Sequence, residues 1–135
     1  PLLGCNSNDN VNIWTISGFK AGDVQMNGVQ LAQVADVSHF GGPSFNFYFC
    51  RDAGGLYVLD GTCSHEHCVL AFDPASTANP GFHCNCHGST FDYNGALLAP
   101  PAPSAMVHYQ LTVKGDGTLV VDSSVIVDPA TRTAG

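Results

Sequence analysis

Positive charge is scarce in this sequence. Four lysines and arginines stand against eleven aspartates and glutamates, which gives a formal net charge of −7 at pH 7. The basic surface that nucleic-acid binding requires is therefore absent, and an anionic membrane surface would repel the chain. A basic protein partner is compatible with this charge.

Long apolar runs and amphipathic helical stretches are also missing. No run approaches the length needed to cross a bilayer, so we expect membrane association only through a lipid, a partner subunit or a segment outside this sequence. The 135 residues suffice for one domain with its own core. Fifteen glycines, eight prolines and 44% hydrophobic residues favour short strands joined by tight turns.

Period-two patterns predict an all-β fold. Residues 1–10 are interpreted as a polar tail or linker, and residues 11–135 as one domain. The clearest strand places Phe45, Phe47 and Phe49 on one face and Asn46, Tyr48 and Cys50 on the other. Residues 52–55 resemble a hairpin turn. The other predicted strands begin near Val11 and cover residues 29–34, 56–59, 107–113, 118–121 and 125–127. In the second strand, alternation places Val29 and Leu31 on one face.

Residues 61–96 break this pattern and contain four of the six cysteines and four of the six histidines. Two short elements, at residues 63–68 (CSHEHC) and 84–89 (CNCHGS), carry all four of these cysteines and three of the histidines. Eighteen residues separate His65 from Cys84, enough for two opposed loops that hold one metal centre between their tips. The sequence therefore predicts an antiparallel β domain with a cysteine- and histidine-rich insert between two strands.

The two elements resemble the paired boxes of the high-potential Rieske iron–sulfur proteins, Cys-x-His-x-x-Cys and Cys-x-Cys-His-Gly-Ser. Phe91-Asp92 and Gly95 follow at the family spacing, and residues 100–103 resemble the family's proline loop. The resemblance is specific over residues 60–105 and architectural elsewhere. It implies a Rieske-type antiparallel β-sandwich or barrel with an inserted cluster-binding subdomain, whose loops span about residues 61–103.

The resemblance also implies a role for each residue of the boxes. Cys63 and Cys84 would bind the inner iron of one 2Fe–2S cluster, and His65 and His87 would bind the outer iron. Cys68 and Cys86 would form a structural disulfide, which lower-potential Rieske ferredoxins lack. Around the cluster, the family assigns a tight turn to Gly88 and a hydroxyl hydrogen bond to a sulfide to Ser89.

The charge of such a ligand set explains its redox range. Four thiolates would leave the oxidised cluster with two negative charges, whereas two thiolates and two neutral imidazoles leave it neutral. An electron enters a neutral site more easily, so potentials rise to roughly −150 to +300 mV, against about −400 mV for all-thiolate plant-type ferredoxins. Reduction also raises the proton affinity of the imidazoles.

This sequence departs from the family at two places. High-potential members usually carry a tyrosine where this chain has Phe91, and its hydroxyl bonds a ligand sulfur. We therefore expect a potential below the top of the range. The tip of the first box carries Glu66 and His67, where the quinol-oxidising family has an apolar residue and glycine. A charged tip fits an apolar quinol pocket poorly.

The resemblance implies one-electron transfer in an exported respiratory chain. The leading setting is the iron–sulfur subunit of a quinol-oxidising cytochrome bc-type complex. The donor would be a cytochrome b-type or other oxidoreductase subunit, the acceptor a c-type cytochrome, and the chain alone would catalyse nothing. Alternatives are the Rieske subunit of a periplasmic molybdenum oxidoreductase similar to arsenite oxidase, and a zinc-stapled module without a redox role. A soluble ferredoxin for a dioxygenase would lack the Cys68–Cys86 pair.

Two cysteines and four histidines lie outside this assignment. Residues 2–5 resemble the end of a bacterial lipoprotein signal, so Cys5 is a candidate for lipidation, and a Cys5–Cys50 bridge and free thiols are the alternatives. Cys50 is also suited to be a small core residue. A disulfide implies an oxidising compartment, the periplasm or the outer face of the cytoplasmic membrane. We expect His67 at the exposed tip and His83 in packing or at the surface, and assign no role to His39 and His108.

Overall fold

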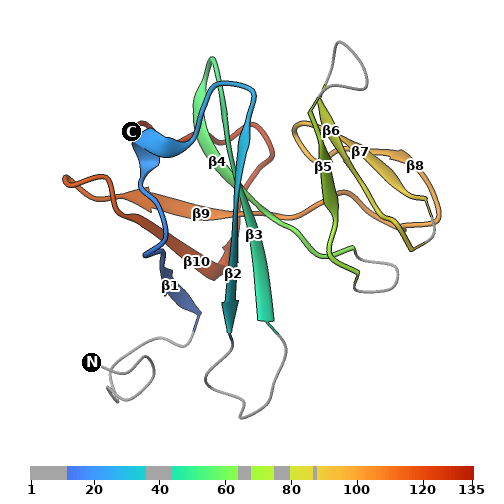
Figure 1. The fold of residues 1–135 in the computed structure, drawn as a ribbon, viewed down its shortest axis with the longest axis horizontal. Helices are drawn as coiled ribbons and strands as arrows, with labels where there is room; N and C mark the ends of the chain where they lie inside the picture. The colour runs from blue at the N-terminus through green and yellow to red at the C-terminus, as the bar shows by residue number, and fades with distance from the viewer. Residues whose placement is uncertain (1–11, 36–43, 64–67, 75–79, 87) are drawn as a thin grey trace.

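A computed structural model shows a β protein made of two antiparallel sheets that lie side by side (Figure 1). Within the described ranges, the helical elements amount to one 3-10 turn, η1 (Ala21–Asp23), and no helix is long and apolar enough to cross a bilayer. The structure describes residues 12–35, 44–63, 68–74, 80–86 and 88–135.

The larger sheet has six strands in the order β1-β10-β9-β4-β3-β2. Its edges approach each other, because residues 15–19, at and after β1, and residues 31–34 of β2 line the same cavity of about 280 Å³. The sheet is therefore curled into an incomplete barrel around an apolar core (Figure 1). Its strands are β1 (Ile13–Thr15), β2 (Val29–Ala35), β3 (Ser44–Asp52), β4 (Gly55–Asp60), β9 (His108–Val113) and β10 (Leu119–Ile126).

Strand β3 is buried on both of its faces. Phe47 and Phe49 point into the core of the curled sheet, where they pack with Trp14. Tyr48 and Cys50 point the opposite way, into a second core shared with the smaller sheet. The predicted alternation of this strand is confirmed, and the strand forms a wall between two apolar clusters.

The turn from β3 to β4 is the predicted hairpin. Asp52 pairs with Gly55, and the Asp52 carboxylate accepts the backbone N–H of Gly54 at 2.9 Å. Gly55 has φ of +131°, and a Cβ there would lie 2.8 Å from the carbonyl oxygen of Thr133. Glycine is required here because the C-terminal segment passes directly over the turn.

The smaller sheet occupies the segment in which the sequence pattern predicts no strands. Each strand has only three residues, too few to show a period, and the four pair in chain order. Phe82 and Phe91 are partners across this sheet and are buried against Tyr48 and Leu59 of the larger one. The strands are β5 (Ala71–Asp73), β6 (Gly81–His83), β7 (Thr90–Asp92) and β8 (Leu97–Ala99).

One strand prediction needs correction, because the two predicted C-terminal runs form one strand, β10, whose pairing with β9 is interrupted by a bulge between Asp122 and Ile126. The structure also shows which faces of β1 and β2 are buried. In β1, Trp14 is buried and Ile13 is 40% exposed, because the indole packs on Phe45 and Phe47. In β2, Leu31 is exposed and Ala32 is buried. The predicted tail at residues 1–10 lies outside the described residues.

Candidate metal centre

The first cysteine–histidine element is a loop between β4 and β5 whose base is closed by backbone hydrogen bonds. The N–H of Cys63 donates to the carbonyl of Cys68 at 2.7 Å, and that of Leu70 donates to Gly61 at 2.7 Å. An isolated bridge joins Thr62 and Val69. The chain thus leaves and returns at adjacent points. His65, Glu66 and His67, at the predicted tip, lie outside the described residues.

The second element is the hairpin between β6 and β7. Cys84 donates its N–H to the carbonyl of Ser89 at 2.8 Å, and Gly88 donates back to Cys84 at 2.9 Å. Gly88 has φ of +84°, a conformation that favours glycine, so this residue permits the tight turn. His87 lies outside the described residues.

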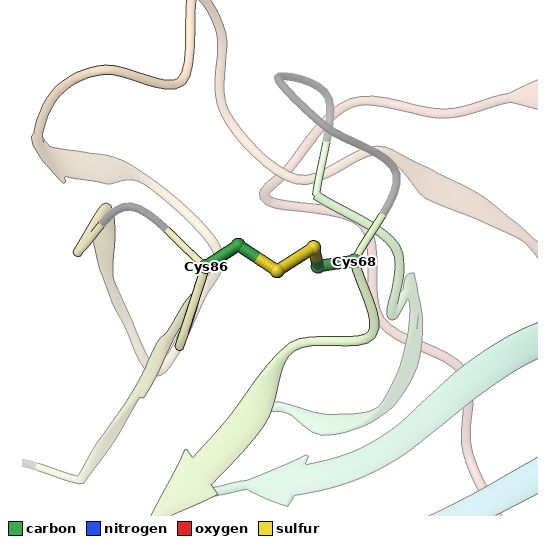
Figure 2. The surroundings of a disulfide bond; sticks show 2 residues. All are labelled: Cys68 and Cys86. Atoms are coloured by element: carbon green, nitrogen blue, oxygen red, sulfur yellow. A yellow bond between two sulfur atoms is a disulfide. The ribbon is translucent and has the colours of Figure 1, made fainter.

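A disulfide between Cys68 and Cys86 ties the two loops together, as the resemblance implied (Figure 2). Its Cα atoms are 6.6 Å apart, within the usual range for a bridge. The sulfur atoms of Cys68, Cys84 and Cys86 all lie within 4.8 Å of one another. The bridge therefore places the Cys84 thiol at the junction of the two loops.

The disulfide leaves a defined set of thiols. Among the described residues, Cys50, Cys63 and Cys84 are free and buried, the last two with 1% of their surface exposed. Cys50 lies on β3, in the core between the sheets, and burial raises the pKa of its thiol. The Cys5–Cys50 bridge is therefore wrong, and Cys50 is a core residue. Cys5 lies outside the described residues.

The donor set fits a cluster with two protein thiolates. Cys63 and Cys84 come one from each loop and share one apolar cluster of buried residues. Thiolate sulfur suits iron–sulfur clusters, and an all-cysteine 2Fe–2S site would require four free thiols. Of the four cysteines in the two loops, the disulfide takes Cys68 and Cys86, so two thiols, those of Cys63 and Cys84, remain there for a cluster.

The segment after β8, which includes residues 100–103, covers the second loop. Ala102 is buried, and its N–H donates to Oγ of the fully buried Ser89 at 2.8 Å. Because Oγ accepts this bond, the hydroxyl hydrogen of Ser89 is available to another acceptor. The serine is thus oriented by the covering segment.

A small cavity lies beside Cys63. It measures about 160 Å³, and its lining includes Cys63, Phe91, Asp60, Thr62 and Met106. Phe91 occupies the position at which the family usually carries tyrosine. Because the ring borders the same cavity as Cys63, the site has space near the thiol for a hydroxyl group.

His108 has a structural position that the sequence did not reveal. It is 2% exposed, stacks on Tyr57, and its Nε2 lies 2.7 Å from the carbonyl oxygen of Asn94. Nδ1 is buried with no hydrogen-bond partner among the described residues. Burial lowers the pKa of the imidazole, so the neutral form is favoured. His83, on β6, is half-buried, and His39 lies outside the described residues.

Residues 17–115, well over half of the 135-residue chain, match the family model described as the Rieske [2Fe–2S] domain. This chain belongs to the Rieske [2Fe–2S] domain family. Its cofactor is one 2Fe–2S cluster, which replaces the zinc alternative. The disulfide and the paired loops are features that the sequence resemblance had indicated.

The Rieske chain is also similar to individual known proteins. It is 34% identical over 80 residues to the cytochrome b6-f complex iron-sulfur subunit of Synechococcus sp. (strain CC9605), covering 59% of this chain and 43% of the relative. A 35% identical match to the same subunit of Prochlorococcus marinus subsp. pastoris has the same coverage. The chain thus spans less than half the length of these relatives.

Solved structures also share the fold at low sequence identity. A chain of a hyperthermophilic respiratory Complex III superposes with a TM-score of 0.55 at 18% identity, covering 75% of this chain and 70% of the other. This likeness shows the Rieske fold alone.

Proposed function

We propose that this Rieske domain is a one-electron carrier whose cluster is held by Cys63 and Cys84 on the inner iron and by His65 and His87 on the outer iron. One observation carries the assignment: the Cys68–Cys86 disulfide leaves one free, buried thiol on each loop. When bound, the cluster accepts and releases one electron at roughly −150 to +300 mV.

The chain's own residues prepare this site in three ways. The disulfide holds the two loops against each other, and the backbone bonds at Cys63 and Cys84 fix where each ligand leaves its loop. Burial of both thiols excludes water, which protects the sulfurs from oxidation. Ser89, oriented by Ala102, would donate its hydroxyl hydrogen to a cluster sulfide.

The proposed setting is the iron–sulfur subunit of a quinol-oxidising cytochrome bc-type complex, with a c-type cytochrome as acceptor. Support comes from the relatives, which are iron-sulfur subunits of cytochrome b6-f complexes. The disulfide supports an oxidising location, the periplasm or the outer face of a membrane. It also argues against a dioxygenase ferredoxin, which would lack the pair. Anchoring, through Cys5 or a partner subunit, is part of this proposal.

An EPR-monitored redox titration at several pH values tests the proposal. We expect a rhombic 2Fe–2S signal with a positive potential that falls as pH rises past the pKa of a ligand histidine. Cys63→Ser and Cys84→Ser should each abolish the wild-type signal, whereas Cys50→Ser should retain it. A negative, pH-independent potential would assign the chain to the ferredoxin class. Zinc without iron would overturn the assignment.

A further inference from the structure

The C-terminal segment returns to the β3–β4 hairpin after β10. Thr133 and Leu56 form an isolated antiparallel bridge, and both of their backbone hydrogen bonds measure 2.8 Å. The hydroxyl of Thr133 donates to the carbonyl of Leu111 at 3.1 Å. This segment, residues 128–135, lies beyond the range that matches the family model.

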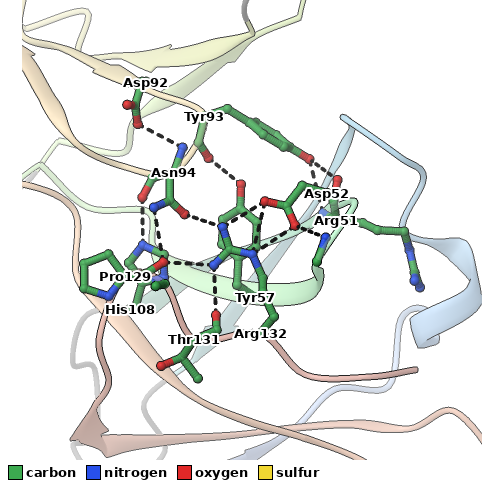
Figure 3. Close-up of polar contacts among 12 residues, drawn as sticks. Arg51, Asp52, Tyr57, Asp92, Tyr93, Asn94, His108, Pro129, Thr131 and Arg132 are labelled. Atoms are coloured by element: carbon green, nitrogen blue, oxygen red, sulfur yellow. Dashed lines mark hydrogen bonds and ion pairs between the residues drawn. The ribbon is translucent and has the colours of Figure 1, made fainter.

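Arg132 fixes this C-terminal segment to the larger sheet. Its Nε and Nη2 donate to both carboxylate oxygens of Asp52 at 2.8–3.1 Å, and its Nη1 donates to the carbonyls of Pro129 and Thr131 (Figure 3). The guanidinium carbon lies 4.0 Å from the centre of the Tyr57 ring. The bonds from Arg132 hold the pKa of the Asp52 carboxyl below its usual range. Both charges are thus paired.

The same guanidinium reaches the smaller sheet. Nη2 of Arg132 donates to Oδ1 of Asn94 at 2.8 Å, and Nδ2 of Asn94 donates to the carbonyl of Pro129 at 3.1 Å. Asn94 lies in the turn between β7 and β8, where Asp92 accepts its backbone N–H at 2.9 Å. One side chain therefore bonds to the hairpin of the larger sheet and to a turn of the smaller sheet.

The neighbouring residue, Tyr93, makes this turn a joint between the sheets. Its hydroxyl donates to the carbonyl of Gly28 and accepts the N–H of Arg51 at 3.2 Å. Its carbonyl accepts the hydroxyl of Tyr57 at 2.6 Å. No local sequence pattern marks these residues, because the partners are 36 to 65 positions apart in the chain.

We propose that Arg132 is a positioning residue, which locks the smaller sheet onto the larger one through Asn94. Strand β7 runs from this joint to Ser89 and Gly88 within a few residues, so the angle of the joint sets the angle of the second cluster loop. The contact between the two sheets involves only residues of the chain and does not depend on the cluster. Its effect on electron transfer rests on the proposed function.

Asn94→Ala is the variant that tests the lock, because it removes the link to the smaller sheet and leaves the Arg132–Asp52 pair intact. Hydrogen exchange of the cluster-loaded protein, resolved by peptide, is the measurement. We expect amides of β5–β8 to exchange roughly tenfold faster or more, the range for losing a hydrogen bond to a charged group. Amides of β3 and β4 should stay within about twofold. Gln110→Ala, at an exposed amide side chain of β9, is the control.

A second pair of variants separates the specific bond from a general loss of packing. Asn94→Asp keeps the acceptor opposite Arg132 and loses only the exposed bond from Nδ2 to Pro129. It should therefore restore most of the protection and the visible circular dichroism of the cluster. Arg132→Lys keeps the charge but lacks the fork that binds Asp52 and Asn94 together, so amides of β5–β8 should exchange faster in it as they do in Asn94→Ala. Equal acceleration in both sheets, no acceleration, or failure of Asn94→Asp to restore protection would overturn the lock. A protein without iron would instead overturn the proposed function.

Discussion

Removing the Cys68–Cys86 disulfide should lower the free energy of unfolding of the iron-free protein by about 3 kcal/mol. The bridge joins cysteines 18 positions apart, and the loop-closure model assigns about that value to a loop of this length. For 135 residues, the unfolding entropy is about 0.28 kcal/mol per kelvin, so the melting temperature should fall by about 11 °C. The estimate applies to the Cys68→Ser/Cys86→Ser double variant.

Urea unfolding followed by tryptophan fluorescence provides the assay. Trp14 is the single tryptophan and is buried in the core of the curled sheet, far along the chain from the bridge. Wild-type protein treated with a reductant should lose the same stability as the double variant, which serves as the internal control. A loss below about 1 kcal/mol would refute the reasoning, since the bridge would then not restrict the unfolded chain as the model requires.

The cluster-loaded protein should respond less strongly to the same change. If Cys63 and Cys84 hold one cluster, the two loops are already linked through it, and the disulfide closes little additional loop. The difference between the iron-free and loaded proteins thus reports on the proposed ligands. Equal losses in both forms would indicate that the cluster does not bridge the two loops.

Three further predictions concern buried side chains. Phe91→Tyr should raise the reduction potential, because its hydroxyl can enter the cavity beside Cys63. Phe72→Tyr is the control. An unchanged potential in Phe91→Tyr would contradict this geometry. His108 has a lowered pKa in the folded state, so below about pH 6.5 the unfolded chain binds a proton that the folded protein does not. The free energy of unfolding should therefore be highest above about pH 6.5 and decline below it. In His108→Gln, the urea midpoint should fall less steeply with decreasing pH over this range. An unchanged slope would show that other groups cause the decline. Cys50 should react with a thiol reagent only as fast as the protein unfolds, whereas rapid labelling would contradict its burial.

The sequence was sufficient where neighbouring residues determine the structure. The alternation at Phe47 and Tyr48 and the turn at Asp52 predicted β3 and its hairpin, and the spacing of the two boxes indicated paired loops. The Cys68–Cys86 bridge came from family resemblance and is confirmed. Whether His65 and His87 are ligands stays a prediction.

The remaining features depend on contacts between distant segments. Strands of three residues, such as β7, carry no readable period, and pairing across the small sheet stabilises them. His108 was assigned no role because its partner, the carbonyl of Asn94, is a backbone atom without a sequence signature. Arg132 was one of four basic residues, and nothing local distinguished it from the others. Trp14 faces inward because the phenylalanines that receive it lie on another strand.

The β3–β4 hairpin, buried on both faces, has a consequence for mutational tolerance. In a strand with one solvent-exposed face, every second position accepts polar substitutions at little cost in stability. In this hairpin, Phe49 and Val58 serve one core while Tyr48 and Leu59 serve the other. Substitutions on either face therefore disturb packing, and a backbone shift caused on one face is passed to the core on the other face. Engineering that aims to adjust the redox site should leave this hairpin intact and begin at the covering segment.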